Sequence, residues 1–195
     1  MKSDIVLAGV GGQGILTIAT ILGSAALADN LFLKQAEVHG MSQRGGDVQS
    51  NLRLSSDPIF SDLIPLGGAD LIVSLEPMEA LRYIQFLSAE GWIVTNSAPF
   101  VNIDNYPEME AIAQELAKHP HVVSFDMDEL AKEVASARSS NLVLLGAASP
   151  FIEMDVQKIE AAIHNLFAPK GEKIVEANIS AFRAGREHAL QIAGR

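Results

Sequence analysis

The sequence of 195 residues contains no cysteine. The chain can therefore form no disulfide, no thiolate zinc site and no cysteine nucleophile, and it can bind no iron–sulfur cluster through thiolates of its own. The HExxH, GxSxG and P-loop motifs are also missing, which leaves no sequence signature of a metalloprotease, an α/β-hydrolase or a P-loop nucleotidase. If the protein takes part in electron transfer, the metal centre must lie on another chain.

Positive charge is scarce and dispersed. The chain has 14 Lys and Arg residues against 24 Asp and Glu residues, and its formal net charge is -10. It has no basic run and no aromatic series for stacking bases, which argues against a nucleic acid or an anionic membrane as partner. The start of the chain lacks a signal-peptide pattern, and the longest apolar stretches, "ILTIATILGSAALA" and "NLVLLGAAS", are too short for a membrane span. We therefore expect a cytoplasmic protein.

Hydrophobic residues are abundant, at 48% of the chain, which is enough for a core of useful size. The length is typical of one compact domain, and no internal repeat or long linker divides it. We expect a single domain over residues 1–195.

The order of the expected elements favours an α/β fold. Strands are expected at residues 4–10, 31–38, 47–54, 69–75, 91–96 and 121–126, and helices at 13–29, 76–91, 106–120, 127–137, 141–149, 155–167 and 174–189. Buried strands that alternate with helices indicate a Rossmann-like, doubly wound and mostly parallel sheet with helices on both faces, followed by a helical C-terminal part. In the second helix we expect Pro77 in the first turn, Gly91 at the C-terminal end and Glu76 as the cap.

The first glycine-rich loop, "GVGGQG", matches the pattern G-x-G-x-x-G and lies between an expected strand and an expected helix. Free N–H groups at the start of a helix favour an anion. We name Gly9, Gly11, Gly12, Gln13 and Gly14 as candidate ligand-binding residues. Three interpretations stay open: a nicotinamide dinucleotide site, a weaker contact with a phosphate or a partner, and close packing alone.

The second glycine-rich loop lies in "EVHGMSQRGG" and follows the second expected strand. Because ligands of doubly wound sheets bind at the carboxyl ends of the strands, we expect this loop on the same edge as the first one. Glu37, Gly45 and Gly46 are candidate ligand-binding residues. His39, Ser42, Gln43 and Arg44 are candidate catalytic residues at an interface with the active site of a partner, because an imidazole exchanges protons near neutral pH and a guanidinium binds carboxylate or phosphate. A polar turn that satisfies its own side chains is the alternative.

Five segments together resemble the gamma-type subunits of 2-oxoacid:ferredoxin oxidoreductases, and most of all the small subunit of the indolepyruvate branch. These segments are "GVGGQG", "KQAEVHGMSQRGGDVQSNLRL", "DLIVSLEPMEALR", "NLVLLGAAS" and "NISAFRAG". The resemblance covers nearly the whole chain, and "EVHGMSQRGG" is its most specific part, because no general fold rule asks for that segment.

The resemblance implies a subunit that acts with a larger partner. Enzymes of this family oxidatively decarboxylate 2-oxoacids to acyl-CoA and pass the electrons to ferredoxin. Thiamine diphosphate, Mg²⁺ and iron–sulfur clusters would be held by the partner, and coenzyme A would be a co-substrate of the complex. The present chain agrees with that division of labour, since it has no cysteine and no Gly-Asp-Gly motif for a thiamine diphosphate site. An autonomous NAD(P)-binding enzyme and a non-catalytic assembly module are the alternatives.

Other positions carry weaker signals. Asn141 is a possible cap of the helix that follows it. His119 and His121 flank a proline but have no accompanying carboxylate pattern, so we expect no metal there. Arg183 and Arg186 lie nearly on one helical face, which indicates a solvated surface or a docking helix.

Overall fold

A computed structural model describes residues 1–40 and 45–194 of the chain. Its strands form one six-stranded sheet in the order β2-β3-β1-β4-β5-β6. The strands are β1 (Lys2–Val10), β2 (Phe32–His39), β3 (Asp47–Ser55), β4 (Ala69–Ser74), β5 (Leu87–Asn96) and β6 (Val122–Phe125). β1, β4, β5 and β6 are parallel neighbours, whereas β3 runs antiparallel to both β1 and β2. The α/β fold and the mostly parallel sheet are thus confirmed, with β3 as the exception.

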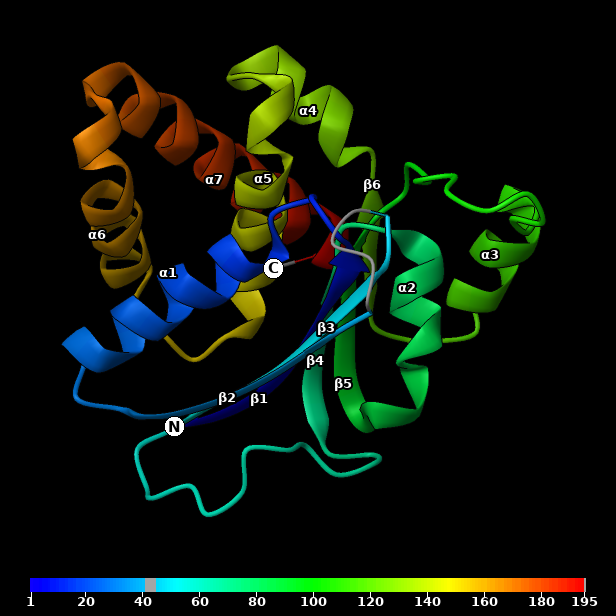
Figure 1. Ribbon diagram of the computed structural model, residues 1–195, viewed down its shortest axis with the longest axis horizontal. Helices are drawn as coiled ribbons and strands as arrows, with labels where there is room; N and C mark the ends of the chain where they lie inside the picture. Colours follow the sequence, from blue (N-terminus) through cyan, green and yellow to red (C-terminus); the bar gives the residue numbers. More distant parts are fainter. Residues whose placement is uncertain (41–44, 195) are drawn as a thin grey trace.

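Helices cover both faces of this sheet. The helices are α1 (Ile15–Ala28), α2 (Pro77–Arg82), α3 (Met109–Leu116), α4 (Met127–Val134), α5 (Ser140–Ala148), α6 (Val156–Phe167) and α7 (Glu172–Ala193). Figure 1 shows α1, α4, α5, α6 and α7 on one side of the sheet and α2 and α3 on the other. No helix in the described part of the chain is both long enough and apolar enough to cross a bilayer.

The alternation of side chains along β1 explains the two layers. Ile5 and Leu7 belong to the hydrophobic cluster with α1, α5, α6 and α7, whereas Val6 and Ala8 belong to the cluster with α2 and α3. Successive side chains of a strand point to opposite faces, so a continuous apolar run is needed where both faces are buried. The run "DIVLAGV" meets this need.

Several expected element boundaries are wrong. The second helix was expected to end at Gly91, but α2 ends at Arg82, and Gly91 lies inside β5. Ile84–Phe86 form a 3-10 turn, and pairing of Leu87 with Ala69 starts the strand directly after it. The third helix begins only at Met109, after Pro107, and α4 stops at Val134 instead of residue 137.

A buried ion pair fastens β1 to β3. The Asp4 carboxylate accepts hydrogen bonds from the Arg53 guanidinium at 2.7 and 3.0 Å and lies 2.9 Å from Lys2 Nζ. Only 3% of the Asp4 side chain and 16% of the Arg53 side chain are exposed. Burial alone would raise the pKa of Asp4, but Arg53 and Lys2 hold it below its ordinary value.

We expect Asp4→Asn to lower the free energy of unfolding at pH 7 by about 3 kcal/mol, because the change leaves a largely buried guanidinium without its counter-ion. The pKa of Asp4 is lower in the folded chain than in the unfolded chain. The ion pair therefore stabilises the fold fully at pH values above the pKa of the unfolded chain, and this stabilisation is lost as the pH falls through the pKa of the folded chain. Urea unfolding should therefore show a smaller loss of stability in acid for the variant than for the natural chain. Glu115→Gln, which breaks an exposed pair with Lys118, is the control. Equal effects of both changes would contradict the prediction.

Candidate functional site

The two glycine-rich loops lie side by side at the carboxyl edge of the sheet. Gly11 N–H donates to the Gly46 carbonyl at 2.8 Å, and Gly45 N–H donates to the Gly11 carbonyl at 3.3 Å. The prediction that both loops share one edge is confirmed. His39 ends β2 opposite Val48, but its side chain, like the whole of Ser42, Gln43 and Arg44, lies outside the described part of the structure.

The first loop is closed by its own glutamine. Gln13 Oε1 accepts from Val10 N–H at 2.8 Å, and Gln13 Nε2 donates to the Leu75 carbonyl at 3.2 Å. One side chain thus ties the end of β1 to the end of β4. Gly14 follows as the residue before α1, at a φ of 87°, a left-handed conformation that glycine adopts without steric cost.

Asn141 meets this loop from the other end of the chain. Its Nδ2 donates to the Gly14 carbonyl at 3.3 Å, whereas its Oδ1 is buried and has no hydrogen-bond partner among the described residues. The residue is only 9% exposed. The expectation that Asn141 caps a helix is wrong: it lies within the first turn of α5, and Ser139 holds the cap position. A buried acceptor without a partner is costly, so this oxygen is suited to a ligand that donates N–H or O–H.

A pocket of about 370 Å³ lies beside the first loop. Its walls include Gly12, Gln13, Asn96, Asp128, Arg138 and Asn141. It opens where β1 leads to α1 on one face and the neighbouring β4 leads to α2 on the other face. Such a switch point is the usual binding crevice of an open α/β sheet. Asp128 accepts hydrogen bonds from Ser140 at 2.5 Å and Asn96 at 3.0 Å, which positions the carboxylate in the wall.

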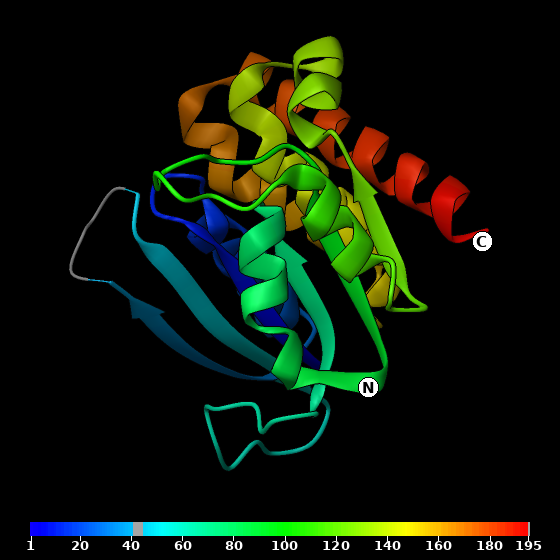
Figure 2. The same ribbon diagram turned by 90° about the vertical axis from the view of Figure 1, so that its right-hand side faces the viewer.

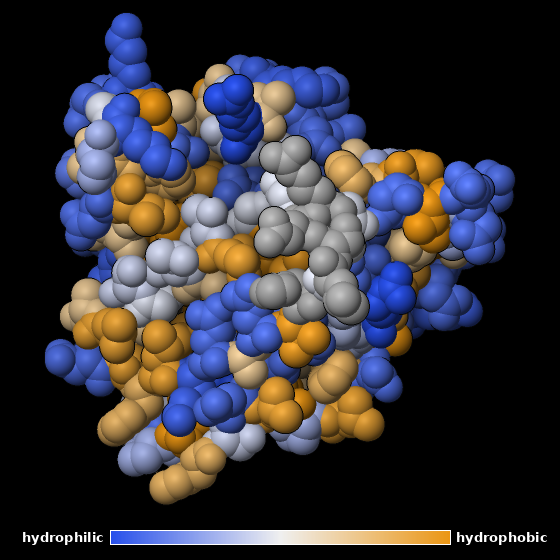
Figure 3. Space-filling model, viewed as in Figure 1, coloured by the Kyte–Doolittle hydropathy of each residue, from blue (hydrophilic) through white to orange (hydrophobic). Residues whose placement is uncertain are grey.

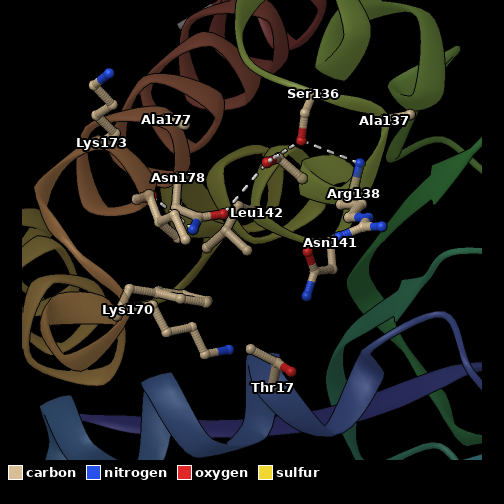
Figure 4. Close-up of a pocket in the computed structure, with 13 residues that line it drawn as sticks. Thr17, Ser136, Ala137, Arg138, Asn141, Leu142, Lys170, Lys173, Ala177 and Asn178 are labelled. Carbon is tan, nitrogen blue, oxygen red and sulfur yellow. Dashed lines mark hydrogen bonds between the residues drawn. The ribbon is translucent and has the colours of Figure 1, made fainter.

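A larger and more basic pocket adjoins the first one across Arg138 and Asn141. It measures about 760 Å³, and its walls include Thr17, Arg138, Lys170 and Lys173 but no carboxylate. Figure 4 shows Thr17, Lys170 and Asn141, which come from three separate elements, around one space, with Lys173 at its outer edge. We call this the basic pocket.

The cations of the basic pocket are exceptional in an acidic chain. Arg138 and Lys173 have no ion-pair or cation–π partner among the described residues, and Lys170 only lies over the Phe167 ring, 5.1 Å from its centroid. Elsewhere in the described part of the chain, each Lys and Arg pairs with a carboxylate except Arg186, which binds Ser149. The paired residues are Lys2, Lys34, Arg53, Arg82, Lys118, Lys132, Lys158 and Arg183. Free cations that converge on one cavity favour an anionic ligand.

Two carboxylates lie beside the end of the second loop, the half-buried Asp47 and the buried Glu79. Asp47, directly after this loop, accepts from Tyr83 Oη at 2.6 Å, and burial followed by the bond to Asp47 raises the pKa of Tyr83. Glu79 is 2% exposed and binds Arg82, and burial raises its pKa, with a further contribution from Asp47. Asn102 Nδ2 donates to the Gly45 carbonyl at 2.6 Å. These contacts fix the end of the loop, at Gly45 and Asp47, against α2 and the segment after β5.

Glu76 is the helix cap that the sequence predicts. Its Oε2 accepts from Glu79 N–H at 2.8 Å, and its Oε1 accepts from Tyr106 Oη. The side chain is fully buried. It therefore stabilises α2 and anchors the segment after β5 near the site.

Several candidates do not reach the pockets. Glu37 lies on β2, which β3 separates from β1, so it is not on the strand beside the first loop where a ribose-binding carboxylate belongs. His121 stacks on Trp92 with ring centroids 4.9 Å apart, and Arg183 pairs with Glu160 at 2.7 Å. Among the residues that the structure describes, no three carboxylate or imidazole groups gather at a place able to hold a metal ion.

Comparison with known proteins identifies the family. Residues 4–188 match the model of the pyruvate ferredoxin/flavodoxin oxidoreductase family. The chain belongs to this family. It is 36% identical to the indolepyruvate oxidoreductase subunit IorB of Archaeoglobus fulgidus, over 97% of this chain and 96% of the relative. It is 38% identical to the subunit of the same name from Thermococcus kodakarensis, over 98% of each.

Solved structures share the fold of this oxidoreductase family member. The gamma subunit of a keto/oxoacid ferredoxin oxidoreductase from Geobacter sulfurreducens aligns with a TM-score of 0.71 and 24% identity, over 97% of this chain and 99% of that one. The 2-oxoglutarate:ferredoxin oxidoreductase of Magnetococcus marinus, solved with 2-oxoglutarate, coenzyme A and succinyl-CoA, aligns with a TM-score of 0.77 and 22% identity. The match covers 97% of this chain but only 31% of the Magnetococcus chain. There the same fold is one part of a longer polypeptide.

Proposed function

We propose that this chain is the small subunit of a 2-oxoacid:ferredoxin oxidoreductase and that it holds the coenzyme A co-substrate at the carboxyl edge of its sheet. The observation that carries the proposal is the pair of adjoining pockets: the unpaired cations Arg138 and Lys173 line the basic pocket, and Asn141, whose Oδ1 has no hydrogen-bond partner among the described residues, lines both pockets.

The two pockets offer what coenzyme A requires. Its phosphates suit the cations of the basic pocket and the N–H groups at the start of α1. Its amide N–H and hydroxyl groups suit Asn141 Oδ1, which can only accept a hydrogen bond. Volumes of about 370 and 760 Å³ are in the range of small-molecule sites.

The redox chemistry requires a second subunit. Thiamine diphosphate supplies the electron sink for decarboxylation when it is bound, and iron–sulfur clusters carry the electrons away. The present chain lacks the cysteines and the Gly-Asp-Gly motif for these groups. We infer a larger partner that holds thiamine diphosphate, Mg²⁺ and the clusters. The identity of 36–38% to subunits named for indolepyruvate supports an aryl pyruvate as substrate.

In this mechanism the small subunit binds coenzyme A and orients it. The pockets would fix the phosphates and amides of coenzyme A so that its thiol reaches the partner's reaction centre. The thiol would then react from a fixed position, and no bimolecular encounter would be needed. The second loop, with His39, Ser42, Gln43 and Arg44, would border that centre. Gln13 and Asn141 hold the first loop in shape while the ligand binds.

A nicotinamide dinucleotide is the less favoured ligand. The usual site needs a carboxylate at the end of the strand next to β1 to bind the ribose. Here β1 lies between the antiparallel β3 and the parallel β4. Glu37 lies on β2, which is separated from β1 by β3.

Calorimetric titration of the isolated chain tests the proposal. We expect coenzyme A to bind with a Kd in the micromolar range, on the order of -8 kcal/mol, and NADH to show no saturable binding. Reduction of a viologen dye by indolepyruvate should appear only when the larger subunit is added. Saturable NADH binding without coenzyme A binding, or turnover by the isolated chain, would contradict it.

A further inference from the structure

The open face of the β2–β3 hairpin has large apolar side chains that nothing in the described structure covers. Val6 and Ala8 of β1 face α2, and their partners on β3 are Asn51 and Gln49, which pair in turn with Ala36 and Val38 of β2. Because paired side chains share a face, Val38 and, by alternation, Phe32 lie on the α2 side of the sheet. Their exposed fractions are 59% and 47%.

The helices α2 and α3 do not extend over this hairpin. Within the described part of the chain, the hydrophobic cluster on the α2 side includes residues of β1, β4, β5 and β6 but none of β2 or β3. Figure 2 shows the hairpin reaching out beyond α2, with the loop between β3 and β4 below it. The sheet face is therefore only half covered.

The loop of residues 56–68 extends the apolar face. Arg53 Nη1 donates to the carbonyls of Ser61 and Leu63 at 3.2 and 3.1 Å, and Lys34 Nζ lies 3.2 Å from Asp62. Ile64 is buried, and its N–H donates to Asn51 at 3.3 Å. The loop is thus tied to the hairpin at several points.

This tied loop presents its apolar side chains to solvent. Phe60 is 95% exposed, Leu63 60% and Leu66 66%. Figure 3 shows hydrophobic side chains among hydrophilic ones over the lower part of the molecule, where this loop runs in Figure 1. We call Phe32, Val38, Phe60, Leu63 and Leu66 the hairpin patch. An ordered loop that displays a nearly free aromatic ring is typical of an interface anchor.

We propose that the hairpin patch is the surface on which the larger catalytic subunit docks, an inference that rests on the proposed function for the identity of that subunit. Two observations favour this occupant over a second copy of the chain. β2 ends at His39 and β3 begins at Asp47, on either side of the second glycine-rich loop, so a body that covers Val38 at this end of the hairpin reaches that loop. In the Magnetococcus protein the same fold is joined to more than twice its own length of further chain, so there it works as part of a larger body.

The charges around the patch are consistent with a permanent interface. Lys34 is paired with Asp62, and both Arg53 and Lys2 are paired with Asp4, so these cations beside the patch are already neutralised. Docking would therefore bury apolar side chains without leaving these charges unpaired.

The test measures assembly and ligand binding separately. The chain and the thiamine diphosphate subunit from the same source are purified, and their Kd is measured by sedimentation for the natural chain, for Phe60→Ser/Leu63→Ser and for Val38→Lys. We expect each variant to weaken assembly at least tenfold. Leu27→Ser, which alters a side chain 62% exposed at the end of α1, should assemble normally.

Because Phe60 and Val38 are exposed, the variants should melt within a few degrees of the natural chain. Titration with coenzyme A should give an unchanged Kd for each, which separates failure of docking from failure of the coenzyme A site. Natural assembly affinity in both patch variants would overturn the inference. So would a dimer of the isolated chain that the same changes dissociate, since the patch would then join two copies.

Discussion

Arg138→Met is expected to weaken coenzyme A binding by about 10- to 100-fold, since hydrogen bonds to a charged group contribute roughly 1.5–3 kcal/mol. Arg138 is the one cation that lines both pockets, and its guanidinium has no carboxylate partner in the described structure. Its charge is therefore available to a phosphate without the breaking of an existing pair. Methionine keeps most of the side-chain length and removes the charge.

Calorimetry on the isolated chain gives the change in Kd, and kinetics of the assembled enzyme give a second measure. The KM for coenzyme A should rise while the KM for the 2-oxoacid stays unchanged, because the partner would hold that substrate. Higher salt should reduce the difference between the natural chain and the variant, as expected for a contact between charges. Arg183→Met is the matched control, since Arg183 pairs with Glu160 away from both pockets.

Two results would contradict this prediction. An unchanged Kd for coenzyme A would mean that the unpaired guanidinium is only a solvated charge. A rise in the KM of the 2-oxoacid alone would mean that the pockets bind the 2-oxoacid and not coenzyme A.

The shared edge of the two glycine-rich loops could be predicted from sequence, whereas the pockets could not. The first prediction needs only the rule that ligands lie at the carboxyl ends of parallel strands, applied to Gly11 and Gly46. The pockets depend on Asn141 meeting Gly14, a contact between residues 127 positions apart. No local sequence pattern predicts a contact between residues so far apart in the chain. The segment "ARSSN" does carry a signal, because it places a cation and three polar residues at the start of an apolar helix.

The hairpin shows a second limit of sequence reasoning. The alternation in "DVQSNLRL" predicts a strand but not its direction, and the antiparallel β3 between β1 and β2 moves Glu37 away from the first loop. Likewise, the residues after Arg82 are compatible with a helix, and Ile84–Phe86 do form a 3-10 turn, but pairing of Leu87 with Ala69 begins a strand directly after it. In both cases a long-range pairing decides between local alternatives.

Gly185→Ala is expected to destabilise the fold by about 3 kcal/mol or more, although helix propensity alone would predict a gain of about 1 kcal/mol. A Cβ at Gly185 would lie 2.0 Å from the Val143 carbonyl oxygen, and one at Gly146 would lie 1.9 Å from the Phe182 carbonyl oxygen. These reciprocal contacts show that α5 and α7 cross backbone against backbone. No change of side-chain rotamer can relieve the clash, so the two helices must separate.

Separation of α5 and α7 should affect the site as well as stability. Phe182 is fully buried at the crossing, and the first turns of α5 and α7 bring Asn141 and Lys173 to the basic pocket. Urea unfolding measures the loss, with the exposed Ser180→Ala on the same helix as the control. At temperatures where Gly185→Ala remains folded, its Kd for coenzyme A should rise. A variant as stable as the natural chain would mean that the crossing tolerates a methyl group, and the basic pocket would then not depend on close contact of these helices.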